Sequence, residues 1–169
     1  MGSSTQLRDK DLVGKIVVSM ADGAQVGTVK DLVFHGLDLN ALVVNGERGE
    51  GLLPYKSLGT NGPDAITIES YTLVDWSAGA GLGPNSMDLS QLRELSVVDS
   101  DGKSLGHFHD LTMDAAGITQ EIAVRTDGVF GIGSHETVIP ASHIRAVGAS
   151  MITVDTGSKA ATASHRGTK

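Results

Sequence analysis

Two histidines separated by one residue, His107 and His109, have the type and spacing that could begin a metal site. On a strand both side chains project to one face, with Phe108 on the other. Two imidazoles are only part of the four-ligand set that a structural zinc ion takes, and no third ligand is obvious in the sequence. We therefore expect an exposed polar face at His107 and His109 and no tightly bound ion.

Other residues of catalytic type do not form a recognisable constellation. The chain has no cysteine, which excludes thiolate chemistry and disulfides. Two Ser-His dipeptides, at residues 134–135 and 142–143, are only sequence neighbours, whereas a nucleophile and its base must converge in space. The glycine-rich string at residues 79–83 is followed by Pro84, not by the helix that a nucleotide-binding loop needs. We expect no enzyme activity, and no catalytic or cofactor-binding residue.

An internal duplication organises the chain. Residues 22–32 and residues 101–111 both read D-G-x-x-x-G-x-x-x-D-L, at an offset of 79. The offset has grown to 86 by Pro54 and Pro140, mostly within residues 125–136, which we expect to be a loop. Repeats that keep their strand phase and grow in loops indicate one small domain present twice.

The repeated stretch carries a predicted hairpin and a predicted bulge. Asp-Gly between apolar runs is a hairpin signal. The apolar residues Val29 and Leu32 are three apart, which breaks the two-residue period of a strand and predicts a β-bulge between them. The same spacing recurs in the second copy. We expect Asp31 and Asp110 to accept hydrogen bonds from backbone N–H groups at these bulges.

Composition and pattern predict the domain boundaries. We expect a disordered N-terminus (residues 1–10), a first barrel (11–70), a linker (71–87), a second barrel (88–156) and a disordered tail (157–169). Whether Met1–Ser4 is native stays open. Trp76 adjoins the linker with Tyr71 and Leu73, and we expect it to be buried against a barrel and to give the two copies a preferred orientation, although a partner-anchoring role stays open.

The predicted core follows the strand pattern. In the first copy it comprises Ile16, Val18, Val29, Leu32, Leu42, Val44, Leu58, Ile66 and Ile68. In the second copy it comprises Leu95, Val97, Phe108, Leu111, Ile122, Val124, Val138, Ile144, Ile152 and Val154.

Charge and hydropathy constrain the compartment and the partner. Thirteen Lys and Arg against 20 Asp and Glu give a net charge of −7, which disfavours binding along a phosphate backbone. Residues 1–10 contain no apolar segment of a signal peptide. No apolar stretch approaches the ~18 residues of a membrane-spanning helix. We expect a cytoplasmic protein without membrane insertion and without nucleic acid as a partner.

The stretch from Gly128 to Pro140, G-V-F-G-I-G-S-H-E-T-V-I-P, resembles the PRC-barrel family. The resemblance extends over about residues 12–69 and 91–155. It implies an all-β fold of two tandem small PRC-type β-barrels joined by a short Gly/Ala linker. From the repeat offsets we expect the two copies to superpose on each other, each with about five or six short strands. The family's barrel occurs in the photosynthetic reaction-centre H subunit and in a ribosome maturation factor, which both dock onto larger assemblies.

These features favour a non-enzymatic protein-binding adaptor. An RNA- or ribosome-associated assembly factor is the first alternative, and a small-ligand or metal-binding protein is the second. We expect the loop from Thr126 to Glu136 to carry specificity, or else to pack on its own barrel as a lip. The sequence does not identify the partner or the pathway, and it leaves a homo-oligomer open.

Overall fold

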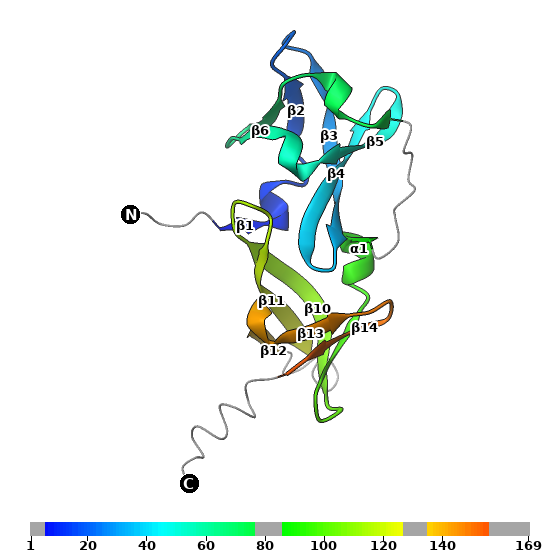
Figure 1. The fold of residues 1–169 in the computed structure, drawn as a ribbon, viewed down its shortest axis with the longest axis vertical. Helices are drawn as coiled ribbons and strands as arrows, with labels where there is room; N and C mark the ends of the chain where they lie inside the picture. Colours follow the sequence, from blue (N-terminus) through cyan, green and yellow to red (C-terminus); the bar gives the residue numbers. More distant parts are fainter. Residues whose placement is uncertain (1–5, 77–85, 127–134, 156–169) are drawn as a thin grey trace, which may run out of the picture. The chain divides into compact units, whose positions relative to one another are not determined.

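A computed structural model describes residues 6–76, 86–126 and 135–155 (Figure 1). The chain divides into two compact units. The first comprises residues 1–90 with 113–118, and the second comprises residues 91–112 with 119–169. In the described part of the chain, no helix has the length and hydropathy needed to cross a membrane.

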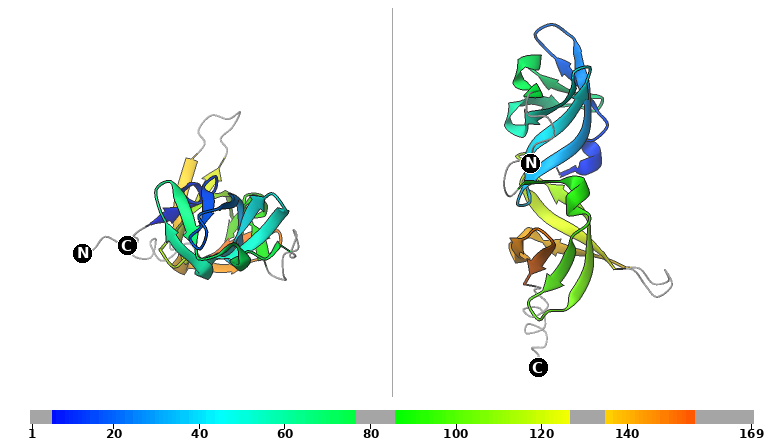
Figure 2. Two further views of the ribbon diagram at one scale, coloured as in Figure 1. Left: turned by 90° about the horizontal axis from the view of Figure 1, so that it is seen from above. Right: turned by 90° about the vertical axis from the view of Figure 1, so that its right-hand side faces the viewer.

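The first unit is a curled sheet (Figure 2). Its strands lie in the order β5-β4-β3-β2-β7-β6, and β8 pairs with β3. The β2–β7 pair is parallel and the others are antiparallel. The elements in chain order are β1 (Leu7–Arg8), η1 (Asp9–Asp11), β2 (Ile16–Ser19), β3 (Gln25–His35), β4 (Asp38–Gly46), β5 (Gly49–Pro54), η2 (Tyr55–Ser57), β6 (Leu58–Asn61), β7 (Ala65–Ile68), η3 (Tyr71–Leu73) and β8 (Ser86–Asp88).

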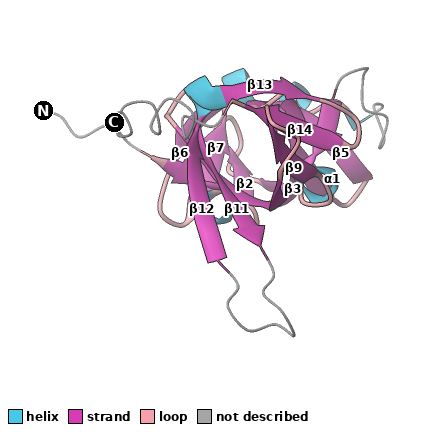
Figure 3. Ribbon diagram, turned by 90° about the horizontal axis from the view of Figure 1, so that it is seen from below, coloured by secondary structure: helices cyan, strands magenta, loops and turns pink. Residues whose placement is uncertain are grey.

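The second unit repeats this topology. Strands predominate in the described chain (Figure 3). The strand order is β12-β11-β10-β9-β14-β13, and the β9–β14 pair is again parallel. The prediction of two tandem all-β barrels is therefore confirmed. The helix α1 (Leu89–Leu92) leads into this unit, followed by β9 (Ser96–Asp99), β10 (Ser104–Met113), β11 (Thr119–Thr126), β12 (His135–Pro140), η5 (Ala141–His143), β13 (Ile144–Val147) and β14 (Met151–Val154).

The predicted bulge lies on β3. Its pairing with β4 shifts register between Val29 and Asp31. The Asp31 carboxylate accepts a hydrogen bond from the backbone N–H of Leu32 at 2.8 Å, and a second from the hydroxyl of Ser90 at 3.2 Å. Asp110 accepts one from the N–H of Leu111 at 2.8 Å. The expected role is confirmed for Asp31, and Asp110 accepts the equivalent backbone bond, whereas the second bulge stays a prediction.

Most predicted core residues are buried, but the first strand of the first copy has the opposite phase. Val17 and Ser19 are buried, whereas Ile16 and Val18 are half-buried. The segment is apolar on both faces, so alternation alone did not determine which face turns inward. Leu58 and Ile144 are also only half-buried.

Val138 is the clearest exception among the predicted core residues, because its side chain is 54% exposed. Its neighbour Ile139 is buried instead and lies opposite Ile122 of β11. Because alternate residues of a strand face opposite sides, burial of Ile139 directs Val138 outward.

The domain boundaries differ from those predicted. Residues 7–11 form β1 and η1, and Leu7 is buried, so the predicted N-terminal disorder is wrong there. Both ends of the predicted linker are structured, and residues 86–90 and 113–118 belong to the first unit. These assignments depend on non-local pairing, such as Val33 with Asp88. The predicted tail, 157–169, lies outside the described residues.

The segment after η3 covers the outer edge of β5. Asp75 and Leu52 exchange two backbone hydrogen bonds, of 2.8 and 3.1 Å. Val74 and Trp76 flank this bridge and lie over Gly51, where an added Cβ would come within 2.6 Å of Val74 Cγ1 and 2.7 Å of Trp76 Cε3. Val74 is buried and Trp76 half-buried. Trp76 therefore packs against the first barrel.

The two other apolar residues of this segment are more exposed than expected. Tyr71 is 44% and Leu73 36% exposed. Both residues belong to the single turn η3, and the Arg48 guanidinium lies 5.9 Å from the centroid of the Tyr71 ring. The preferred mutual orientation of the two copies stays a prediction.

We predict that Asp31→Ala destabilises the first unit by about 1–3 kcal/mol, because the backbone N–H groups of Leu32 and Leu89, both in part-buried hydrogen bonds, lose their acceptor. Asp22→Ala is the control, since its carboxylate accepts a bond from Ala24 N–H in an exposed turn. Urea unfolding followed by the fluorescence of Trp76, the only tryptophan, measures both. Equal losses in the two variants would contradict the role assigned to the bulge.

We predict that Gly51→Ala displaces the Trp76 ring, shifts its fluorescence to longer wavelength and destabilises the first unit by about 1–3 kcal/mol, because the new methyl group has no room. Gly148→Ala is the matched control, because a Cβ there meets only Met151 O at an ordinary 3.4 Å. An unchanged spectrum for Gly51→Ala would refute the described packing of the ring.

Candidate functional site

The outer edge of β12 is the feature that distinguishes the second barrel from the first. Val138 of β12 lies opposite Ala123 of β11, as Leu52 of β5 lies opposite Val43 of β4. The register is the same along both pairs of strands, so each residue of β12 has a counterpart in β5 at the offset of 86. Val138 is the counterpart of Leu52.

The two edges differ in what covers them. Leu52 is bridged by Asp75 and half-buried. Nothing in the described part of the second unit bridges Val138 in this way, and its side chain is 54% exposed. Because the register is shared, the backbone N–H and C=O of Val138 point outward, as those of Leu52 do. An edge of this kind can pair with a further extended segment.

Charged side chains surround this edge on the outer face of the sheet. Glu136 lies 3.7 Å from Arg125 Nη2 and 3.6 Å from His109 Nε2, measured from its Oε2 atom. All three side chains are more than one-third exposed, so water screens the ion pairs and they add little to stability. Together with Val138, these side chains offer a partner charged and hydrogen-bonding groups beside an apolar one.

The first barrel has a related pair at the corresponding place. Lys30 Nζ donates a hydrogen bond to Glu50 Oε2. This hydrogen bond, followed by the charge of Glu50, raises the pKa of Lys30. Lys30 and His109 are equivalent in the repeat, as are Glu50 and Glu136, so an acid–base contact on the outer face is retained in both copies.

The two histidines singled out by spacing are placed differently. His109 is directed toward Glu136 and His107 is exposed. Within the described residues, no three or more side chains of His, Asp or Glu come together as a metal site. The absence of a tightly bound ion stays a prediction.

The Ser-His dipeptides provide no nucleophile–base pair that the structure describes. Ser142 is exposed and His143 half-buried in η5, where the carbonyl of His143 accepts a hydrogen bond from Asp155 N–H at 2.7 Å. His135 begins β12 and is exposed, and Ser134 lies outside the described residues.

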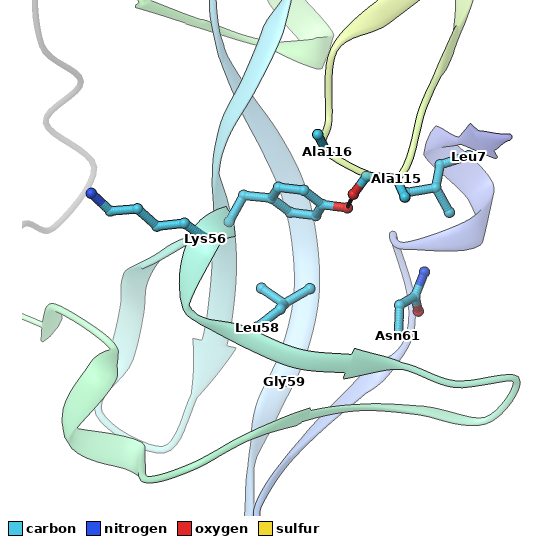
Figure 4. Close-up of a pocket in the computed structure, with 8 residues that line it drawn as sticks. Leu7, Lys56, Leu58, Gly59, Asn61, Ala115 and Ala116 are labelled. Carbon is cyan, nitrogen blue, oxygen red and sulfur yellow. Dashed lines mark hydrogen bonds between the residues drawn. The ribbon is translucent and has the colours of Figure 1, made fainter. Parts of the chain in front are cut away.

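A hollow of about 510 Å³ in the first unit was not predicted from the sequence (Figure 4). Tyr55 is one of its lining residues and donates a hydrogen bond to Ala115 O at 2.8 Å. Burial, and then the charge of Asp114, raise the pKa of Tyr55, so the phenol stays protonated near neutral pH. The remaining lining residues are Leu7, Lys56, Leu58, Gly59, Asn61 and Ala116.

Two polar groups that line this hollow already have hydrogen-bond partners within the chain. Asn61 Oδ1 accepts a hydrogen bond from Lys15 Nζ at 2.7 Å, and the Tyr55 hydroxyl is bound to Ala115. In Figure 4 the Lys56 side chain extends away from Asn61. The hollow therefore lacks the converging polar groups that fix a ligand, and the edge of β12 is the stronger candidate.

Comparison with known proteins agrees with the fold. The PRC-barrel domain model matches residues 4–74 and again residues 84–161. A search of curated proteins finds no match. The family match covers both repeats, with the topology described above. This chain therefore belongs to the PRC-barrel domain family and carries the domain twice.

Proposed function

We propose that this chain is a non-enzymatic protein-binding adaptor that uses the outer edge of β12 as its contact surface. The observation that carries the proposal is the contrast between Leu52, bridged and half-buried, and Val138, 54% exposed at the same place in the repeat. The fold is compatible with a protein-interaction module. The first barrel thus shows how an edge strand in this register can be covered, and β12 can be compared with it.

Strand addition is the binding mode that this surface favours. An extended peptide that pairs with a sheet edge gains affinity from backbone hydrogen bonds and specificity from its alternate side chains. Here Val138 supplies apolar area, and Glu136, Arg125 and His109 supply charge and hydrogen-bonding groups.

The loop between Thr126 and Glu136 forms part of the same proposal. Thr126 and His135 pair at the base of the β11–β12 hairpin, and residues 127–134 lie outside the described part of the chain. The loop therefore begins and ends next to the proposed contact edge. We retain it as the element that adds partner specificity.

A protein partner fits the charge better than a nucleic acid does. The net charge of −7 repels phosphate, whereas a partner segment with basic residues complements it. No described feature favours the alternatives of RNA binding or small-ligand binding.

We predict that Val138→Arg lowers capture of partner proteins from extract of the native cell at least tenfold. The substitution adds charge and bulk to the contact surface, and because the side chain is exposed the fold should change by less than about 0.5 kcal/mol. Met20→Arg is the control, because Met20 is 62% exposed on the first unit and lies outside the proposed surface. Quantitative mass spectrometry of the captured proteins, with wild type in parallel, gives the readout.

The proposal fails if Val138→Arg captures the same partners at the same level as wild type. It also fails if Met20→Arg loses the same partners, since the loss would then be unrelated to β12. Val138→Pro provides an independent variant, because proline removes one edge N–H and is tolerated on edge strands.

A further inference from the structure

The covered edge of the first barrel shows how a segment lies along an edge strand in this register. Leu52 and Asp75 exchange both backbone hydrogen bonds in an antiparallel bridge. Side chains alternate along an extended segment, so Asp75 lies on the outer face beside Leu52. Val74 and Trp76 lie on the opposite face, over Gly51. A partner segment that adds to β12 in the same way divides its side chains between the same two faces.

The backbone groups of β12 set the length of such a segment. Val138 is the counterpart of Leu52, so its N–H and C=O point away from β11, and by alternation those of Glu136 do so too. Pro140, the next residue in this series, has no N–H to donate. A partner segment of about four residues, from the one opposite Ile139 to the one opposite Glu136, therefore covers both complete hydrogen-bonding positions.

The side of this edge opposite the outer face has less room than its counterpart in the first barrel. Gly51 is buried, and an added Cβ there would come within 2.6 Å of Val74 Cγ1 and 2.7 Å of Trp76 Cε3. At the offset of 86 its counterpart is Thr137, which is exposed. The threonine side chain takes the space that the valine and the tryptophan use in the first barrel. Partner residues that lie over Thr137 must therefore be small.

A second glycine under the tryptophan has changed in the same direction. An added Cβ at Gly46 would lie 2.8 Å from Trp76 Cη2. Its counterpart, at the same place in the β11–β12 hairpin, is Thr126. The Thr126 hydroxyl donates a hydrogen bond to Leu105 O at 2.7 Å, which holds this side chain in place. The second barrel therefore excludes a large partner side chain at the position that Trp76 takes in the first barrel.

The outer face of the edge favours an apolar partner residue followed, two positions later, by a basic one. The partner residue opposite Val138 meets an exposed apolar side chain. The partner residue opposite Glu136 meets a carboxylate that Arg125 contacts from β11, the side away from the partner. Residues directly opposite each other in a sheet are close enough for opposite charges to attract and like charges to repel. Because the segment is antiparallel, its apolar residue precedes its basic residue.

We propose that the edge of β12 binds an antiparallel extended segment of a partner protein with the pattern small–apolar–small–basic. The two small residues lie over Thr137, the apolar residue lies beside Val138, and the lysine or arginine pairs with Glu136. This inference rests on the proposed function, because it uses the same contact edge, and it adds the partner sequence that the edge selects.

Peptide binding to the full chain tests the pattern. The probe is a capped peptide with Ala-Val-Ala-Lys at its centre, and the amide NMR signals of Val138 and Glu136 report its binding during a titration. We expect both signals to shift. The reversed peptide, Lys-Ala-Val-Ala, has the same composition and should bind at least about threefold more weakly. The Leu52 amide, already bonded to Asp75, is the internal reference and should not shift.

An exchange of charge assigns the basic position. Glutamate in place of the peptide's lysine should weaken binding at least about threefold, because two carboxylates then lie opposite each other. Glu136→Lys in the protein should reverse the preference, so that the glutamate peptide binds more tightly than the lysine peptide. A Glu136→Lys chain that keeps the original preference would contradict the assigned pairing.

An exchange of size assigns the small position. Tryptophan in place of the peptide's second alanine should weaken binding at least about fivefold, because the ring meets Thr137. Thr137→Gly should restore most of this loss, since it recreates the space that Gly51 provides in the first barrel. Tighter binding of the tryptophan peptide to the unchanged chain would contradict the assigned packing.

The whole inference is overturned if the lysine peptide does not shift the Val138 signal, or if the lysine, reversed and glutamate peptides bind equally well. Its outcome is separable from that of the proposed function. If capture from cell extract depends on Val138 while the peptides show no preference, the partner pattern is wrong and the function stands. If the peptides show the expected preferences while Val138→Arg captures the same partners as wild type, the function is wrong and the selectivity of the edge stands.

Discussion

The rest of this structure depends on how the two edge strands of each small curled sheet satisfy their outward-facing backbone groups. An edge strand leaves backbone N–H and C=O groups without a partner in the sheet, and it invites pairing with another segment. The first barrel meets the constraint at β5 with the Asp75–Leu52 bridge, which buries Val74 and places Trp76 over two glycines. The same register in the second barrel presents Val138 to solvent. Function, in our account, arises from this difference.

Duplication followed by divergence explains why the difference is local. The strand order, the parallel pair, the single helical turn after the proline and the aspartate that accepts the next residue's backbone N–H recur in both copies. These features set the closure of the sheet, and a change in any of them affects the whole barrel. Residues 135–138 of β12 are exposed, so they can change at little cost to the fold.

The sequence predicted what is repeated and what is locally encoded. The three-residue spacing from Val29 to Leu32 indicated the bulge, because it conflicts with strand alternation, and Asp31 follows from the chemistry of an unpaired N–H. It did not predict the phase of Val17, whose neighbours on both sides are equally apolar. The exposure of Val138 was missed for the same reason, since Val138 and Ile139 are adjacent and pairing with β11 decides which faces the core.

The candidate site could not be predicted from the sequence, because it depends on pairing between residues that are distant in the chain. The bridge between Leu52 and Asp75 joins residues that are remote in sequence, and no local pattern signals it. The pairing of β8 with β3, which moves residues 86–90 into the first unit, is likewise non-local. Only comparison of the two copies in a shared register makes the edge of β12 stand out.

Site-specific photocrosslinking from residue 138 in the native cell tests the central claim most directly, with the crosslinker at residue 20 as reference. We expect crosslinks from residue 138 to a partner protein that are absent from residue 20. No crosslinks from residue 138, or the same products from both positions, would contradict the assignment of β12 as a contact edge.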